Sequence, residues 1–199
     1  MRVDIVRRHR SRPTLNANFY RELRERIAGL AIGGSTLRNM TGVGGIKIAR
    51  NFCSREETLK CVTRQKRFAD GLNTLTQLLA RELPPRKLPG GNRWGPARKI
   101  LNIFLSDATY NIYLRKRYKL DQIEDALEVP LDSYVAKGLS TDAQSLPRPE
   151  ILGSWRGVVH TTPDLNARYQ AIASIIAKHR GYRCRSHLDL RYWRQKAAG

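Results

Sequence analysis

Lys99 and Asp132 are the two residues of this sequence whose types and positions best suit covalent chemistry. Lys99 follows a glycine-led turn at 95–98 and lies in an apolar segment of helical character that continues through Leu105. Asp132 stands where it would cap the next helix, because Asp is a favoured N-cap and an apolar-spaced run begins after it. A lysine and an aspartate at two helix starts, in a very basic chain, indicate chemistry on nucleic acid.

The segments around these two residues resemble two elements of the base-excision DNA glycosylases, the superfamily that includes endonuclease III. These elements are the helix-hairpin-helix and the Gly/Pro-rich loop with its aspartate that follows. The family hairpin reads roughly Leu-Pro-Gly-Val-Gly-Arg-Lys-Thr-Ala-Asn-Val-Val-Leu, and the later element reads Val-Asp-Thr-His-Val. The residues of this chain that match, aligned without gaps, are Gly95, Arg98, Lys99, Asn102 and Leu105 in the first element and Asp132 and Val135 in the second.

The chain also departs from the family pattern. Ala97 replaces the second glycine of the hairpin, and Tyr134 replaces the usual His. Lys99 and Asp132 are 33 residues apart, which is farther than the equivalent pair of endonuclease III, and the four-cysteine iron–sulfur ending is absent. The resemblance therefore covers about a quarter of the chain and indicates a divergent member of the superfamily.

The resemblance implies a DNA glycosylase that flips a damaged or modified base out of the duplex and cleaves its N-glycosidic bond. Asp132 would stabilise the cation-like sugar or activate a nucleophile. Lys99 would attack the anomeric carbon and leave a Schiff base, from which β-elimination cuts the strand. Burial beside Ile100 and Ile103, or a neighbouring Arg98, would have to lower the pKa of Lys99 for that role. A Lys99 that stays charged would bind phosphate only, and the enzyme would be monofunctional.

The partner implied is duplex DNA carrying a damaged or modified base, in repair or in defence against phage with modified DNA. Backbone amides of the hairpin turn would hold a DNA phosphate, and neighbouring aromatic residues would wedge the duplex or stack on the flipped base. No cofactor and no metal are expected. The DNA-binding residues expected from the hairpin and its surroundings are Arg93, Trp94, Gly95, Ala97, Arg98 and Tyr134, with Trp155, Tyr192 and Trp193 as further aromatic candidates.

Two other functions fit the sequence. The first is a non-catalytic nucleic-acid-binding protein that uses its hairpin turns and basic tails. The second is a metal-dependent nuclease, which needs clustered carboxylates. The acidic residues that could form such a cluster have instead the spacing of one solvated helix face; they are Asp121, Glu124, Asp125 and Glu128. The glycosylase hypothesis predicts that Lys99 and Asp132 meet at the rim of one basic cleft, and side chains on opposite faces would exclude it.

The composition of the chain limits the classes of fold and of binding partner that it can have. The chain has 199 residues, 41% of them hydrophobic, and a formal net charge of +20, which favours a polyanionic partner. Three cysteines without metal-like spacing indicate reduced thiols, and no apolar run of 18 residues or secretory signal is present. We expect a monomeric, cytoplasmic, nucleoid-associated protein.

Helical spacing of apolar residues dominates the sequence, and no alternating run of useful length indicates a strand. The sequence predicts a mainly α, compact multi-helix domain over 1–199 with a helix-hairpin-helix element, basic N- and C-terminal segments, and a two-lobed arrangement about a linker at 84–93. A second glycine turn at 41–45 is interpreted as a tight turn, or as a helix start that holds a phosphate. The expected helices cover 16–30, 56–83 as one or two helices, 96–118, 121–127, 132–139 and 164–179.

Overall fold

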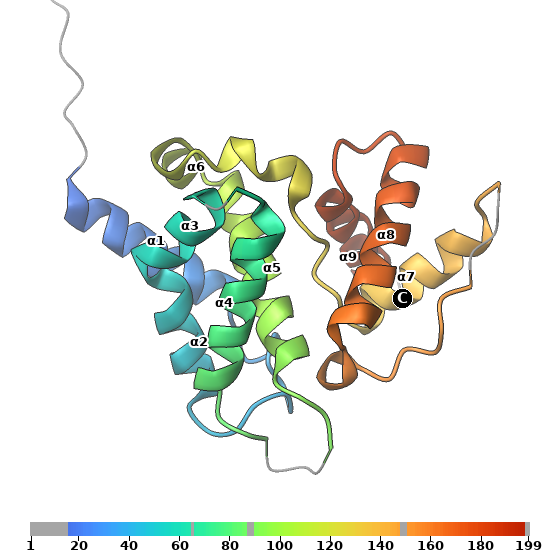
Figure 1. The fold of residues 1–199 in the computed structure, drawn as a ribbon, viewed down its shortest axis with the longest axis horizontal. Helices are drawn as coiled ribbons and strands as arrows, with labels where there is room; N and C mark the ends of the chain where they lie inside the picture. The colour runs from blue at the N-terminus through green and yellow to red at the C-terminus, as the bar shows by residue number, and fades with distance from the viewer. Residues whose placement is uncertain (1–15, 65, 87–89, 148–150, 198–199) are drawn as a thin grey trace, which may run out of the picture.

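The protein is an all-helical molecule within the part of the chain that the computed structural model describes, namely residues 16–64, 66–86, 90–147 and 151–197. These residues form nine α-helices and no strand, which confirms the predicted mainly α class. The helices gather in two groups, α1–α6 and α7–α9, which lie beside one another (Figure 1).

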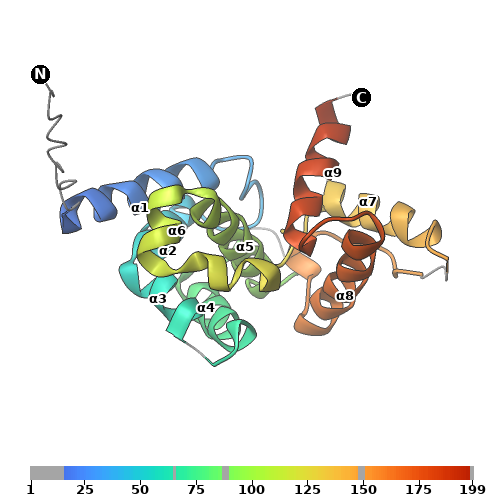
Figure 2. The ribbon, with the colours of Figure 1, turned by 90° about the horizontal axis from the view of Figure 1, so that it is seen from above.

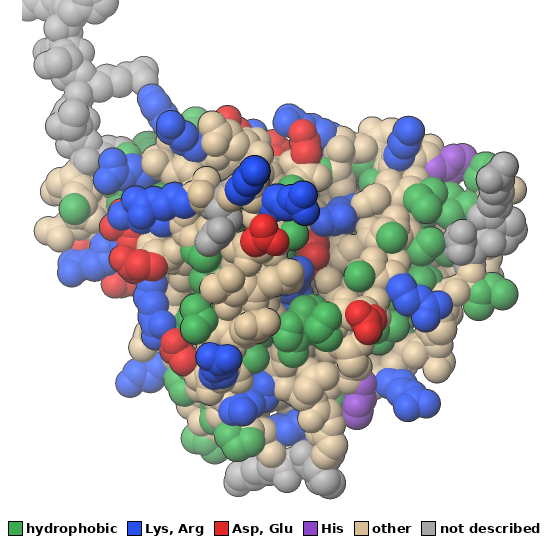
Figure 3. Space-filling view, viewed as in Figure 1, with side chains coloured by type: hydrophobic (Ala, Val, Ile, Leu, Met, Phe, Trp, Pro, Cys, Tyr) green, Lys and Arg blue, Asp and Glu red, His purple; other side chains and the backbone are tan. Residues whose placement is uncertain are grey.

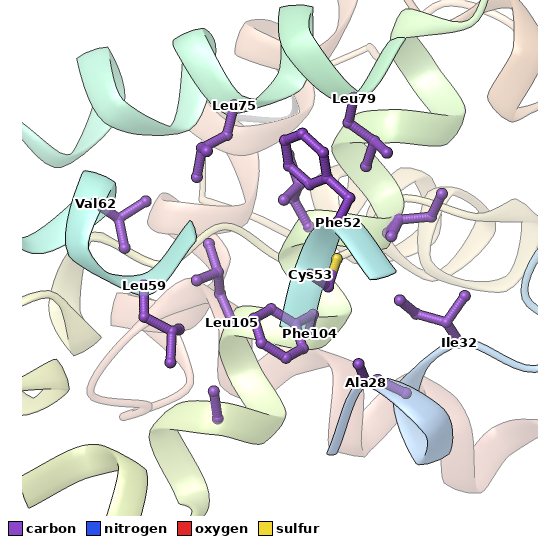
Figure 4. Close-up of a cluster of buried hydrophobic side chains, with 14 of the residues drawn as sticks. Ala28, Ile32, Phe52, Cys53, Leu59, Val62, Leu75, Leu79, Phe104 and Leu105 are labelled. Atoms are coloured by element: carbon purple, nitrogen blue, oxygen red, sulfur yellow. The ribbon is translucent and has the colours of Figure 1, made fainter. Parts of the chain in front are cut away.

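The N-terminal lobe, residues 16–127, is built around α5. Thirteen of the seventeen residues of α5 are buried, because α1, α2, α4 and α6 all pack against it. Figure 4 shows part of the resulting apolar cluster, which includes Phe52, Phe104 and Leu105. The helices of this lobe are α1 (Ala17–Ala31), α2 (Gly45–Ser54), α3 (Glu56–Arg64), α4 (Phe68–Glu82), α5 (Trp94–Tyr110) and α6 (Ile112–Tyr118).

The C-terminal lobe, residues 128–197, has a separate apolar cluster that begins at Val129 and includes Tyr169 and Tyr192. Its helix α7 packs against both of the others. In two perpendicular views, α9 lies on the side of this lobe that faces α5 (Figures 1 and 2). The helices are α7 (Ser133–Gln144), α8 (Pro163–His179) and α9 (Leu188–Ala197).

The division between the two apolar clusters falls at 127–129 rather than at the proline-rich segment 84–93. That segment joins α4 to α5, and both of these helices contribute to the same cluster. It also contacts the other lobe, since the backbone N–H of Asn92 donates to the carbonyl of Val159 at 2.6 Å and its Nδ2 donates to the carbonyl of Thr161 at 3.1 Å. This segment thus connects two helices of the N-terminal lobe and also contacts the C-terminal lobe.

The predicted helix over 96–118 is divided at Asn111. The Asn111 Oδ1 accepts hydrogen bonds from the backbone N–H groups of Tyr113 and Leu114, both at 3.1 Å, and so starts α6 as a separate helix. The segment 56–83 likewise forms two helices, α3 and α4. Helix-competing side chains such as Asn explain a break that apolar periodicity alone does not reveal.

Candidate active site

Lys99 and Asp132 meet between the two lobes. Lys99 belongs to α5, and Asp132 precedes α7; the Lys99 Nζ lies 3.8 Å from the Asp132 Oδ2. The lysine side chain is only 7% exposed, and its Nζ also donates to the carbonyl of Thr36 at 3.4 Å. Two residues 33 positions apart in the chain therefore form an ion pair, so their side chains do not point to opposite faces of the molecule.

Asp132 divides its two carboxylate oxygens between two tasks. Its Oδ1 accepts hydrogen bonds from the backbone N–H groups of Tyr134 and Val135, both at 3.0 Å, and caps α7 as predicted. Its Oδ2 is the atom that faces Lys99. The two amide donors and the positive end of the helix dipole stabilise the ionised carboxylate. The side chain is 29% exposed, so this is the side from which the pair meets solvent.

A third carboxylate belongs to the same cluster. Asp189, in the first turn of α9, has its pKa raised to about 7, mainly by burial and then by the charges of Asp132 and Asp107, while Lys99 acts in the opposite direction. Burial also raises the pKa of Asp107, which lies two helical turns after Lys99 on α5. Burial is thus the main cause of both raised pKa values.

Sequence reasoning missed Asp189 and Asp107 as site residues. Asp107 could have been found, because Lys99, Ile103 and Asp107 recur at four-residue intervals and so share one face of a helix. Asp189 carries no such signal. It lies 57 residues beyond Asp132 in the chain, and only the packing of α9 brings it near Lys99.

Three of the residues expected to bind DNA are instead in the interior. Gly95, Ala97 and Arg98 are all buried at the start of α5. A Cβ at Gly95 would overlap the carbonyl oxygen of Val158, so this glycine is needed for the close approach of α5 to the C-terminal lobe. The assignment of these three residues to an exposed phosphate-binding turn is thus corrected: Ala97 lies in the N-terminal apolar cluster, and Gly95 and Arg98 contact the C-terminal lobe.

Arg98 is the centre of a buried polar network. Its Nε and Nη2 donate to the two carboxylate oxygens of Glu128, each at 2.8 Å, and its Nη1 donates to Asn73 and Thr76 of α4. Glu128 also accepts hydrogen bonds at 3.1 Å from Asn102 of α5 and Asn166 of α8. These bonds join helices of both lobes at a single carboxylate.

Glu128 stays ionised in the interior. Burial acts to raise its pKa, but the hydrogen bonds and charge of Arg98, with the two asparagine amides, hold the pKa below its ordinary value. Glu124 is also buried, and pairs with Arg115 at 2.7 Å. The interpretation of 121–128 as a solvated acidic face is therefore wrong for Glu124 and Glu128, whose charges are used inside the fold.

The other expected DNA-binding residues differ in exposure. The Trp94 ring is partly buried, and the Arg98 guanidinium lies 5.3 Å from its centre. Arg93 is exposed, with its Nη1 donating to the carbonyl of Leu83. Tyr134, directly after the Asp132–Ser133 start of α7, is 52% exposed, and Trp193, one turn after Asp189 on α9, is 64% exposed. Tyr134 lies two residues after Asp132, and Trp193 lies four residues after Asp189.

The second glycine turn lines a hollow of about 520 Å³ at the start of α2. Gly44 precedes this helix in the left-handed region at φ 83° and provides no side-chain cap. Arg38 and Lys47 line the same hollow. The loop that carries this turn also includes Thr36, whose carbonyl binds Lys99, so the basic hollow and the Lys99–Asp132 pair are neighbours along one loop.

Comparison of the chain with family models, with curated proteins and with solved structures gives no match. Within the described part of the chain, no three His, Cys, Asp or Glu side chains are grouped so as to hold a metal ion. None of the helices in that part combines the length and the apolar character needed to cross a bilayer.

Proposed function

We propose that the protein is a DNA glycosylase with AP-lyase activity, in which Lys99 is the nucleophile and Asp132 the carboxylate that stabilises the sugar. The observation that supports this proposal is the 3.8 Å approach of the Lys99 Nζ to the Asp132 Oδ2, from separate lobes and at the two positions that resemble the glycosylase motifs. An ion pair of largely buried groups is costly to maintain for stability alone, which favours a functional role.

The proposed reaction begins with the target nucleotide flipped out of the duplex. The neutral Lys99 amine attacks C1′ of the deoxyribose, and the C1′–N bond breaks with its electron pair leaving on the base, which takes up a proton. Positive charge develops on the sugar during this step, and the Asp132 carboxylate offsets it. Loss of a proton from the lysine nitrogen and opening of the sugar ring then give a Schiff base, from which β-elimination releases the 3′ phosphate.

The charge of the molecule supports DNA as the substrate. A formal net charge of +20 is far beyond what solubility needs, and Lys and Arg side chains are spread widely over the N-terminal lobe (Figure 3). In this proposal the damaged or modified base belongs to cellular DNA under repair or to phage DNA. In this proposal the protein acts as a monomer associated with the nucleoid.

A panel of duplexes, each with one damaged or modified base, tests this function. The protein is incubated with each duplex without metal; one portion is reduced with borohydride and another is cleaved with alkali. We expect release of at least one base by the wild type and a trapped covalent adduct, with the adduct lost in Lys99→Gln and base release lost in Asp132→Asn. Alkali-revealed breaks without an adduct would instead mean a monofunctional glycosylase.

The variants are chosen to keep the fold. Asn is as good an N-cap as Asp, so Asp132→Asn removes the charge and keeps the cap of α7. Lys137→Gln is the matched control for Lys99→Gln, because Lys137 is an exposed lysine of α7 outside the cluster. Lys137→Gln is expected to release the base and form the adduct as the wild type does.

A non-catalytic nucleic-acid-binding protein is the second candidate, favoured by the position of the ion pair as a bridge between α5 and α7. In that case no base would be released from any duplex. Salt-sensitive binding to DNA would persist, and Lys99→Gln would weaken it only slightly.

A further inference from the structure

A polar hollow of about 430 Å³ lies in the N-terminal lobe, between α3 and the end of α6. Because α6 begins directly after α5, this α3–α6 hollow is at the end of α5 opposite to the start, where Lys99 stands (Figure 1). The described residues that line it are Glu56, Lys60, Thr63, Arg64, Arg117, Tyr118, Lys119 and Gln122. The hollow is therefore separate from the Lys99–Asp132 site.

Cations dominate the α3–α6 hollow. Four of its eight described lining residues are Lys or Arg, and the one carboxylate among them is that of Glu56. That carboxylate is already paired, since the Lys60 Nζ lies 2.7 Å from its Oε1. Lys and Arg side chains also gather over α3 and α6 on the face of the molecule in Figure 3. A concave surface with such an excess of positive charge attracts and concentrates anions.

Two sides of the hollow supply these cations. On α3, the lining residues between positions 56 and 64 recur at helical spacing and share one face. On α6, the Arg117 guanidinium lies 5.2 Å from the centre of the Tyr20 ring of α1. The Tyr118 hydroxyl accepts a hydrogen bond of 2.6 Å from the buried Arg24, which fixes the end of α6. The cations of α6 are thus held in place before any ligand binds.

Lys119 follows α6 in a backbone conformation that favours glycine. Its φ of 54° and ψ of 42° lie in the left-handed region, at the position where helices commonly end with Gly. Among the described residues, Asn39 is the one other non-glycine residue with a positive φ. Glycine at 119 would relieve the strain but remove a cation from the hollow. Strain of this kind is typical of functional sites.

Phosphate groups are the anions that suit these side chains. The Arg guanidinium donates in pairs to phosphate oxygens, and the Lys ammonium binds them as a compact charge. Tyr118 is the one aromatic side chain among the described lining residues; it is buried, and its hydroxyl is used by Arg24. No lining aromatic ring is therefore exposed for a base to stack on. The hollow fits the charge of a nucleic-acid backbone and not its sequence.

We propose that the α3–α6 hollow binds a phosphate of the DNA backbone through Arg64, Arg117 and Lys119, as a DNA-binding surface separate from the Lys99–Asp132 site. The choice of DNA as the source of the phosphate rests on the proposed function. The surface holds the duplex and takes no part in base removal. Its loss lowers the affinity for DNA and leaves the reaction rate of the bound complex unchanged.

Binding of a fluorescent, undamaged duplex over a series of salt concentrations tests this surface. Arg64→Gln/Lys119→Gly should bind about tenfold more weakly at low salt, and the slope of log affinity against log salt should fall by about two, one for each lost contact. The matched control is Lys116→Gln/Lys137→Gln, which removes the same charge from exposed lysines outside the hollow. It should lose much less affinity. Equal losses in the two double variants would overturn the proposal.

Lys119→Gly alone separates binding from folding. We expect its melting temperature to equal or exceed that of the wild type, because glycine adopts the left-handed conformation without strain. Its affinity for the duplex should nevertheless fall about threefold. A lysine that only ends α6 would give no loss of affinity on this substitution, and wild-type affinity of Lys119→Gly would overturn its role as a DNA contact.

Single-turnover rates at saturating DNA distinguish this surface from the proposed function. On a duplex with one abasic site, Arg64→Gln/Lys119→Gly should form the borohydride-trapped adduct as fast as the wild type does. A slower rate at saturation would overturn the separation of the two sites. A wild type that forms no adduct and releases no base, beside a double variant that still loses affinity, would overturn the glycosylase function and support the hollow.

Calorimetric titration with inorganic phosphate distinguishes the two sources of the ligand. We expect weak binding to the wild type that is lost in Arg64→Gln/Lys119→Gly, together with the loss of DNA affinity. Loss of phosphate binding with unchanged DNA affinity would assign the hollow to a free phosphate compound and overturn DNA as its ligand.

Discussion

Arg98 and Lys99 are neighbours in the sequence, yet their cations have opposite surroundings. Both side chains are almost fully buried at the start of α5. Arg98 meets one carboxylate, Glu128, in two hydrogen bonds of 2.8 Å, and its other donor is satisfied by α4. Lys99 meets Asp132 at 3.8 Å and lies within the electrostatic influence of Asp189. The Arg98–Glu128 pair is thus short and held in a network of hydrogen bonds, whereas the Lys99–Asp132 pair is longer and closer to solvent.

This difference indicates what each cluster does. In the Arg98–Glu128 network nearly every donor is used, charge is balanced, and the pKa of Glu128 is held low, so the network favours one arrangement of the lobes. In the Lys99 cluster the Asp132 carboxylate lies 3.8 Å from the cation, and the pKa of Asp189 rises to about 7, mainly because it is buried. A pKa raised in this way costs stability and is typical of sites that perform chemistry.

The largest effect on stability is expected from a substitution that breaks the Arg98–Glu128 hydrogen bonds. Arg98→Met leaves the Glu128 carboxylate buried without its cation and should lower the free energy of unfolding by about 3–5 kcal/mol. Urea denaturation measures this loss. Adding Glu128→Gln to the same chain removes the orphaned charge and should recover part of it. A loss below about 1 kcal/mol in the single variant would contradict the structural role of the network.

A substitution of Lys99 should affect catalysis more than stability, the reverse of the effect expected at Arg98. Lys99→Gln is expected to reduce base release about 100- to 1000-fold, equivalent to roughly 2.7–4 kcal/mol of activation free energy. Its unfolding free energy at pH 5 should change less than that of Arg98→Met, because the Lys99–Asp132 ion pair is longer, at 3.8 Å against 2.8 Å, and its carboxylate is more exposed than Glu128. Single-turnover rates and urea denaturation on the same preparation provide both values. Equal effects on rate and stability would remove the distinction between the two clusters.

The raised pKa of Asp189 should make the stability of the fold depend on pH. The pKa of Asp189 is about 7 in the fold and 3.8 as its ordinary value, so the folded chain holds the proton more tightly. Stability therefore falls as pH rises between these values. Asp189→Asn removes this loss and should be more stable than the wild type by about 2 kcal/mol at pH 8, a value reduced for partial solvent screening.

Thermal or urea unfolding at pH 5 and pH 8 checks that expectation. At pH 5 the difference between Asp189→Asn and the wild type should be much smaller. Asp121→Asn, at an exposed site, should follow the wild type at both values. A variant that is less stable than the wild type at pH 8 would show that Asp189 forms a stabilising ion pair and not a proton-exchanging group.

The smallest effect on stability is expected at the exposed edge of the cluster. Tyr134→Ala should change the unfolding free energy by less than about 0.5 kcal/mol, because the side chain is 52% exposed. If the ring stacks on DNA, affinity for duplex with a modified base should fall about fivefold or more. Fluorescence anisotropy at fixed salt measures this, and Lys137→Gln provides a neighbouring comparison. Unchanged affinity for Tyr134→Ala would place the stacking contact elsewhere, with Trp193 as the next candidate.

The helical character and several helix ends could be predicted because they depend on near neighbours. Apolar residues at helical spacing predicted α1, α8 and the start of α5. Asp132 caps α7 as expected, and Thr162 with Pro163 begins α8. The division of the predicted 96–118 helix at Asn111 was missed, since a single capping side chain outweighs an uninterrupted apolar pattern.

For the site, the sequence determined by itself which residues could do chemistry: it singled out Lys99 and Asp132 through their helix positions and motif context. Only the tertiary structure decided that the two meet, that Asp189 joins them, and that Arg98 is used inside the fold. The physical reason is the range of the interactions. Caps and periodicity act over about four residues, whereas burial and charge pairing depend on how two lobes pack across contacts far apart in the chain.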